Sequence, residues 1–171
     1  ENDGSGGLLE VVKQQSTETT GAEIISRWNV SDEITLEGNI TYQDAEFSEG
    51  SNVGKQPRRQ PEFTGNAAVS YNNGFVDARL GVSYFGDSYA NDDNSVELDS
   101  HTIATFNAGY SWELNNDQEI RLGISVWNLF DSEGITEGSP RQGNSQVSGG
   151  EFFIGRPVLP RRVSLTARYD F

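Results

Sequence analysis

The residues of this sequence that could bind a ligand or a metal ion are acidic and amide side chains, which offer oxygen ligands, and arginines. Both kinds lie in polar segments. The acidic stretch DSYANDDNSVELDS, at 87–100, carries four side chains of the kind that bind Ca²⁺. They are Asp92, Asp93, Asn94 and Asp99. Their spacing is not that of a known calcium loop. Solvated loop carboxylates are therefore the preferred interpretation, with a calcium site as the alternative.

Arginines stand in two further polar segments, KQPRRQP at 55–61 and SPRQGN at 139–144. Arg58, Arg59 and Arg141 could contact an anionic ligand, because guanidinium groups pair well with carboxylates and phosphates. Alternatively, they offset neighbouring acidic residues, which is the interpretation that we favour.

The composition argues against an enzyme and against a nucleic-acid partner. The chain has no cysteine and one histidine, His101, so it offers no thiolate site or Cys–His pair. We expect His101 to be a solvated residue at the edge of a loop, and we predict no catalytic residue, cofactor or metal ligand. The net charge of −14 opposes binding to a polyanion such as DNA or RNA.

Strict alternation of apolar and polar residues runs through most of the chain and predicts strands. In RRVSLTARYDF at the C-terminal end, for example, every second residue from Val163 to Phe171 is apolar. About seven such segments occur, and none has a helical period. They cover 21–30, 33–47, 62–71, 76–84, 104–112, 120–126 and 161–171. No apolar run approaches the roughly 18 residues of a membrane-spanning helix.

The connections between these segments alternate strictly between short turns and long loops. NNG at 72–74 is a short turn of the hairpin type, whereas residues 131–160 form the longest loop. Short turns at one end and long loops at the other are typical of outer-membrane barrels. The sequence thus predicts an all-β, antiparallel, up-and-down transmembrane barrel with short periplasmic turns and long extracellular loops.

Aromatic residues gather near both ends of the expected strands, as they do at the two surfaces of a membrane. Tyr42, Phe63, Tyr84 and Trp127 lie toward the long loops. The expected girdle beside the short turns consists of Trp28, Tyr71, Tyr110, Trp112 and Tyr169.

The opposite face of the strands is too polar for a dry core. It carries many short Ser, Thr and Asn side chains, with charged residues between them. We expect five arginines on this face to point into a wet barrel lumen: Arg27, Arg79, Arg121, Arg162 and Arg168.

Four motifs together resemble the TonB-dependent outer-membrane receptors. GAEIISRWNVSDEITLEGNITYQDAEF resembles a hairpin late in their barrel, and NLFD at 128–131 is similar to the end of their penultimate strand. GRPVLPRRVSLTARYDF resembles their C-terminal strand. GITEGSPR at 134–141 is similar to a loop motif of some subfamilies. The resemblance covers roughly 21–171.

The resemblance implies a 22-stranded barrel that is filled by a plug domain and takes up a scarce ligand with energy delivered through TonB. Residues 1–171 would form the C-terminal segment of that barrel, and the plug, the TonB-contacting segment and the earlier strands would be absent from this sequence. The lumen arginines would contact the plug. The loop arginines would contact ligand or lipopolysaccharide. The last strand would be read by the barrel-assembly machinery through Val163, Leu165, Ala167, Tyr169 and Phe171.

Two other functions stay open at this point. A passive outer-membrane porin would share the barrel but would have no plug domain upstream. A secreted, soluble all-β module that binds carbohydrate through its aromatic residues would need no detergent. Iron chelates, cobalamin and oligosaccharides are the ligand classes that the receptor interpretation allows.

Overall fold

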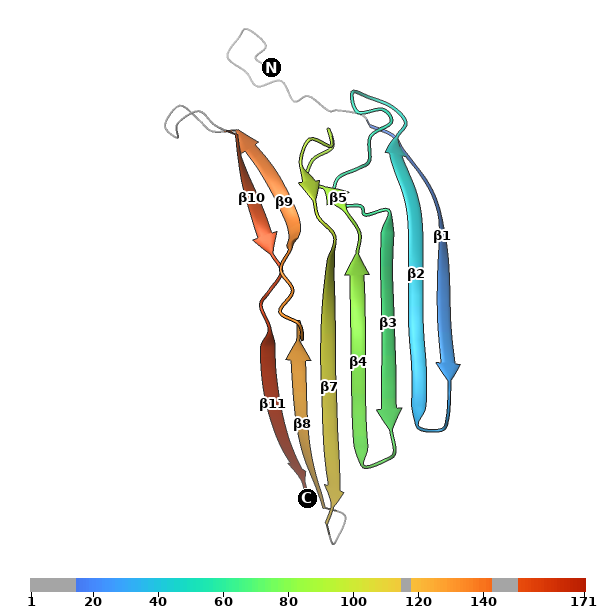
Figure 1. Cartoon of the computed structure of the whole chain (residues 1–171), viewed down its shortest axis with the longest axis vertical. Coiled ribbons are helices and arrows are strands. Elements are labelled where there is room, and N and C mark those ends of the chain that lie inside the picture. The colour runs from blue at the N-terminus through green and yellow to red at the C-terminus, as the bar shows by residue number, and fades with distance from the viewer. Residues whose placement is uncertain (1–14, 115–117, 143–150) are drawn as a thin grey trace.

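A computed structural model describes residues 15–114, 118–142 and 151–171, and every regular element among them is a strand. Seven strands form one antiparallel sheet in the order β1-β2-β3-β4-β7-β8-β11 (Figure 1). They are β1 (Thr17–Asn29), β2 (Ile34–Phe47), β3 (Phe63–Asn72), β4 (Val76–Phe85), β7 (His101–Glu113), β8 (Glu119–Trp127) and β11 (Arg162–Asp170). The predicted all-β, antiparallel sheet is thus confirmed.

Four shorter strands, which the sequence analysis assigned to loops, form two separate hairpins. One pairs β5 (Ser88–Tyr89) with β6 (Glu97–Leu98), and the other pairs β9 (Ile135–Gln142) with β10 (Glu151–Pro157). The interpretation of 131–160 as a single loop was therefore wrong. Its glycines and prolines interrupt the alternation that identified the other strands.

The predicted alternation of connections is also confirmed. The short turns lie at the lower end of the sheet, and the long connections lie at the upper end (Figure 1). The turn between β3 and β4 shows why it is tight: Gly74 has a φ of 91°, and the Asn73 side chain accepts hydrogen bonds from the Phe75 and Val76 amides. The predicted turn at 115–117 lies outside the described residues.

The strand register places apolar side chains opposite one another across the whole sheet. Because side chains alternate between faces along a strand, one continuous row defines the apolar face. The row consists of Trp28, Leu36, Val69, Leu80, Phe106, Val126 and Val163. The rows next to it on either side belong to the opposite face of the sheet, which is the polar face. One of them, on the first four strands, contains Asn29, Thr35, Ser70 and Arg79.

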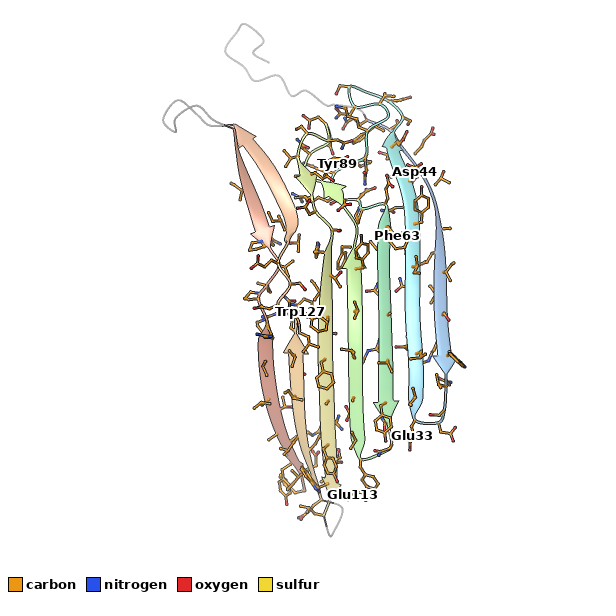
Figure 2. The ribbon with its side chains drawn as sticks, in the orientation of Figure 1. Glu33, Asp44, Phe63, Tyr89, Glu113 and Trp127 are labelled. Atoms are coloured by element: carbon orange, nitrogen blue, oxygen red, sulfur yellow. The ribbon has the colours of Figure 1, made fainter. Side chains whose placement is uncertain are left out.

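Among residues 15–114, 118–142 and 151–171, nothing packs on either face over most of the sheet. The buried apolar residues gather at the upper end beneath the long connections, among them Ala45, Phe47, Ala90 and Leu98. Side chains project from the strands along the length of the sheet (Figure 2). Lower down, large apolar side chains remain exposed, and Leu165, for example, is 79% exposed. An apolar face of this size needs a partner or an apolar solvent.

In the part of the chain that the structure describes, β1 pairs only with β2 and β11 pairs only with β8, so this sheet is open and has a free edge at each outer strand (Figure 1). Among the described residues, no helix has the length and apolar content needed to cross a membrane.

Candidate functional site

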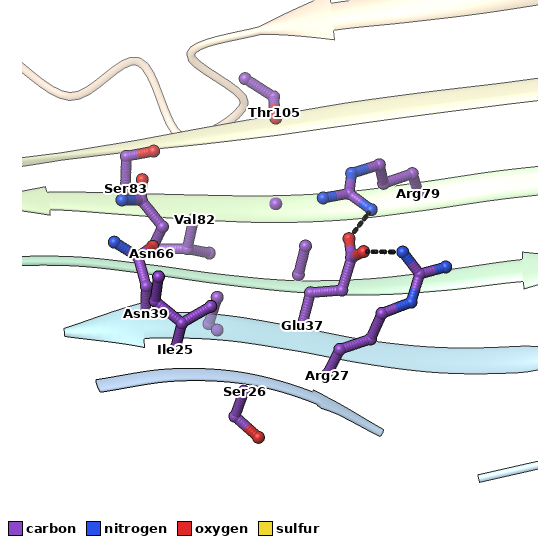
Figure 3. Close-up of a pocket in the computed structure, with 14 residues that line it drawn as sticks. Ile25, Ser26, Arg27, Glu37, Asn39, Asn66, Arg79, Val82, Ser83 and Thr105 are labelled. Atoms are coloured by element: carbon purple, nitrogen blue, oxygen red, sulfur yellow. Dashed lines mark hydrogen bonds and ion pairs between the residues drawn. The ribbon is translucent and has the colours of Figure 1, made fainter. Parts of the chain in front are cut away.

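The polar face carries a charged cluster that spans four neighbouring strands (Figure 3). Glu37 on β2 lies 3.1 Å from Nη1 of Arg27 on β1 and accepts a 2.6 Å hydrogen bond from Nη1 of Arg79 on β4. The same Arg79 nitrogen donates to Oγ of Ser70, at 2.7 Å. Two guanidinium groups thus share one carboxylate, which leaves the cluster with a formal charge of +1.

Small residues on β3 and β4 make this long-range contact possible. Ala68 lies directly opposite Glu37, and Gly81 lies opposite Ala68. Since neither residue fills the space above the sheet, the Arg79 side chain can cross β3 to reach Glu37. The cluster therefore depends on where small residues stand as much as on the charges.

A shallow groove of about 450 Å³ runs over this cluster. Beyond the ion pairs, Asn39, Asn66, Ser83 and Thr105 line it and offer hydrogen-bond donors and acceptors. The groove is open to solvent, and its charged and hydrogen-bonding side chains suit a wet lumen or a polar protein partner.

A second ion pair follows the same design nearer the short turns. Arg121 on β8 reaches across β7 to Asp77 on β4, and its other terminal nitrogen lies 3.3 Å from Oγ of Ser111. Gly109 is the residue under the pair. A Cβ atom there would lie 2.7 Å from Arg121 Nη2 and 2.8 Å from Asp77 Oδ1, so any side chain must displace the pair.

We expect the free energy of unfolding of Gly109→Ala to lie about 1 kcal/mol below that of Gly65→Ala, because the added methyl group at position 109 separates Asp77 from Arg121. Gly65→Ala is the matched control, since a Cβ atom at position 65 meets only ordinary contacts, at 3.6 Å and beyond. The control should be neutral or slightly stabilising, because alanine suits a strand better than glycine. Urea titration in detergent micelles measures both. Equal values for the two variants would contradict the role of Gly109.

The remaining predicted lumen arginines also lie on the polar face. Arg162 is opposite Trp127, and Arg168 is opposite Arg121. Nε of Arg168 donates a 2.9 Å hydrogen bond to Oδ1 of Asp170 on the same strand. All five predicted arginines thus share one face, while their contact with a plug stays a prediction.

The acidic segment at 87–100 binds other loop residues. Asn94 exchanges two hydrogen bonds with the Gln56 backbone, and Asp92 accepts one from the Arg58 amide, at 3.2 Å. Two hydrogen bonds from Ser95 hold the pKa of Asp93 below its usual value; the one from the Ser95 hydroxyl has the larger effect, and the one from the Ser95 amide the smaller. Among the described residues, no three Asp, Glu or His side chains converge as metal ligands would. These contacts favour a structural role for the acids over the calcium alternative.

The loop arginines differ in their surroundings. Arg58 faces Asp92, at 3.8 Å, and Arg59 faces Glu137 on β9, at 3.5 Å. Arg156 on β10 shares that glutamate, at 2.9 Å. Both contacts agree with the favoured interpretation that these arginines offset acids. Arg141 belongs to β9, not to a loop, and its side chain lies outside the described part.

The motif NLFD forms a clamp that sequence reasoning did not foresee. Asn128 is fully buried, and its side-chain amide donates to the carbonyl oxygens of Ser132 and Leu159, at 2.9 and 3.0 Å. Its side-chain oxygen accepts from the Ser132 amide, at 2.8 Å. Asp131 accepts from the Arg161 amide, at 2.7 Å. The clamp therefore joins the two ends of the segment that carries β9 and β10.

The five predicted girdle residues all lie on the apolar face near the short turns. Tyr110 and Trp112 pack with ring centres 4.2 Å apart, and Tyr169 stacks on Phe171, at 5.9 Å. Near the long connections, Tyr42, Phe63 and Tyr84 share that face. Trp127 does not: the register places it opposite Thr105 and Arg162, on the polar face.

His101 is less solvated than expected. Its ring stacks on Phe85 with centres 5.0 Å apart, and its buried Nδ1 atom has no hydrogen-bond partner in the part of the chain that the structure describes. A Cβ atom at Gly134 would lie 3.0 Å from His101 Cβ, so glycine permits this packing.

An open, amphipathic antiparallel sheet, with aromatic residues at the ends of its apolar face and charges on its polar face, defines a segment of a membrane β-barrel wall. The sequence identifies the family as well: residues 2–129 match the family described as TonB dependent receptor-like, beta-barrel. The chain belongs to this family of Gram-negative outer-membrane transport receptors. The predicted resemblance is thereby confirmed.

Solved receptor structures share the fold. The ferric preacinetobactin receptor BauA of Acinetobacter baumannii is 18% identical over 94% of this chain, with a TM-score of 0.71. The ferric yersiniabactin uptake receptor FyuA of Yersinia pestis is 20% identical over 92%, also with a TM-score of 0.71. The ferric-catecholate import receptor Fiu of E. coli K12, in its closed form, is 20% identical over 98%, with a TM-score of 0.65. The chain spans only 23%, 24% and 22% of these three structures, respectively.

Proposed function

We propose that the chain is part of the barrel wall of an outer-membrane receptor that takes up a ferric chelate with energy delivered through TonB. The observation that carries the proposal is the seven-stranded amphipathic sheet, which follows the fold of ferric chelate receptors over nearly its whole length. Among the ligand classes that the sequence left open, iron chelates fit these relatives best.

In this proposal the free edges of β1 and β11 pair with further strands and close a barrel of the 22-stranded type. Edge strands expose unpaired backbone groups, and inside a membrane these groups need partners. The apolar face would contact lipid, with the girdle of Trp28, Tyr71, Tyr110, Trp112 and Tyr169 at the periplasmic surface.

The polar face would then surround a plug domain. The Arg27–Glu37–Arg79 cluster, with its formal charge of +1, suits a carboxylate on such a partner. Arg121 and Arg168 are already engaged by Asp77 and Asp170, so we assign them to the wall itself. Arg162 completes the set of predicted plug contacts.

We further propose roles for the two ends of the strands. The exposed, alternating strand β11, with Phe171 beyond it at 96% exposure, would be the segment that the barrel-assembly machinery recognises. Arg59 and Arg141, at the end of the sheet that carries the long connections, would meet ligand or lipopolysaccharide phosphate. Arg58 faces Asp92, so we assign it to the connection itself.

Uptake of radioactive iron tests the proposal. Cells that lack the gene for this chain should lose energy-dependent uptake of one ferric chelate from a panel, and the intact gene should restore it. Deleting the tonB gene in the restored strain should abolish uptake again, because the proposed transport requires that energy source.

Two outcomes would contradict the proposal. Uptake that persists without TonB would indicate a passive porin. Unchanged iron uptake, with loss of cobalamin or oligosaccharide uptake, would keep the receptor class but change the ligand.

A further inference from the structure

Two arginines from distant parts of the chain meet at one carboxylate near the upper end of the molecule. Nη1 of Arg59, from the connection between β2 and β3, lies 3.5 Å from Glu137. Nη1 of Arg156, on β10, lies 2.9 Å from the same side chain. This group carries a formal charge of +1 within a chain whose net charge is −14.

The backbone holds Arg59 in a conformation that arginine rarely adopts. Its φ is 59°, in the left-handed region that favours glycine, and its amide donates a 2.8 Å hydrogen bond to the Tyr89 carbonyl. One guanidinium nitrogen also donates to the Gly138 carbonyl, at 3.3 Å. Backbone strain of this kind is commonly kept where a side chain must be positioned for a function.

The space beside the two arginines can hold a small ligand. An open cavity of about 340 Å³ is lined by both of them and by Glu137, Gly138, Ile154, Gly155 and Pro157. The Arg156 side chain is 73% exposed and the Arg59 side chain 44% exposed. Each guanidinium keeps further N–H groups for an incoming acceptor, because each has five donors.

We propose that Arg59 and Arg156 form a binding site for an anionic group, a carboxylate or a phosphate, and that Glu137 is its built-in competitor. An anion with two or more oxygens can bridge two guanidinium groups, which form strong paired hydrogen bonds with such acceptors. Glu137 occupies that position when no anion is bound. The site would therefore bind an anionic group of the receptor's ligand. This biological role rests on the proposed receptor function.

Titration of the purified full receptor with inorganic phosphate, in detergent micelles at low ionic strength, tests the site. Phosphorus NMR reports bound phosphate through line broadening. Glu137→Gln removes the competitor and should tighten binding about tenfold, since an ion pair no longer has to be broken. Arg59→Gln and Arg156→Gln should each weaken binding about tenfold.

Arg58→Gln is the matched control. It removes the same charge from the adjacent residue, which pairs with Asp92 rather than Glu137, and should change the affinity less than about twofold. An unchanged or weaker affinity in Glu137→Gln would overturn the proposal. Equal losses in Arg58→Gln and Arg59→Gln would also overturn it, because they would indicate a general charge effect. Mobility on SDS gels without heating confirms that each variant is folded.

The source of the anion follows from a second titration in nanodiscs with and without lipopolysaccharide. If lipopolysaccharide blocks phosphate binding, its phosphates occupy the site; if it does not, the site receives a soluble ligand. Either result supports the shared chemistry.

Failure of the proposed function is separable from failure of the site. Iron uptake that does not need this gene, together with tighter phosphate binding in Glu137→Gln, would refute the function alone. Iron uptake that depends on the gene and on TonB, without a response to Glu137→Gln, would refute the site alone.

Discussion

Alanine at position 128 is expected to lower the free energy of unfolding by about 3 kcal/mol, the largest loss that we expect from removing a single polar side chain here. The Asn128 side chain is fully buried and makes three hydrogen bonds with backbone groups of Ser132 and Leu159. Alanine would leave these groups without partners in a site with no exposed surface. Alanine would also be strained at the φ of 52° that this residue adopts.

Asn107→Ala is the control for this variant. Asn107 is exposed on the polar face, so its loss should cost less than about 0.5 kcal/mol. Urea titration of the detergent-solubilised receptor, followed by the gel mobility of the folded barrel, gives both values. A cost for Asn128→Ala as small as that of the control would show that the clamp does not hold the segment between β8 and β11.

Arginine in place of Leu165 is expected to prevent stable insertion of the barrel. Leu165 stands near the middle of β11 on the apolar face and is 79% exposed. A charge on the lipid face of a barrel near mid-membrane costs about 2–4 kcal/mol. That cost is a large fraction of the total stability of a folded domain.

Ser164→Arg is the matched control, because the neighbouring residue in a strand points to the other face. The same charge, one position away, should leave folding nearly unchanged, since the polar face already carries Arg162 and Arg168. Insertion into lipid vesicles, followed by the mobility of the folded band, measures both variants. Equal folding yields would show that the face of Leu165 does not contact lipid.

The sequence pattern predicted the sheet well because it depends on a local period. Any residue two positions along a strand returns to the same face, so alternation alone sorted Val163 from Ser164 and Leu80 from Arg79. Strand pairing then followed from the short turns. The hairpin of β9 and β10 was missed because Gly138, Pro140 and Gly155 obscure that period.

The site was predictable only in part. The sequence placed Arg27, Arg79 and Arg121 on one face, but it did not reveal that the first two share Glu37 or that the third reaches Asp77. The contacts of Arg79 with Glu37 and of Arg121 with Asp77 cross an intervening strand and depend on a small residue there. The contact of Arg59 with Glu137 joins residues distant in the chain, and no local pattern signals it.

The clamp at Asn128 also bears on how the sheet forms. Consecutive strands of the sheet are neighbours along the chain, so folding can add one hairpin at a time, and the entropy of closing each connection sets the difficulty of each step. The connection from 128 to 161 is roughly eight times longer than the turn at 30–33, and its closure costs about 2 kcal/mol more. Asn128 holds Ser132 close to Leu159, so the hairpin of β9 and β10 lies outside the loop that closes when β11 pairs with β8. The last strand can then dock as though it followed a short turn.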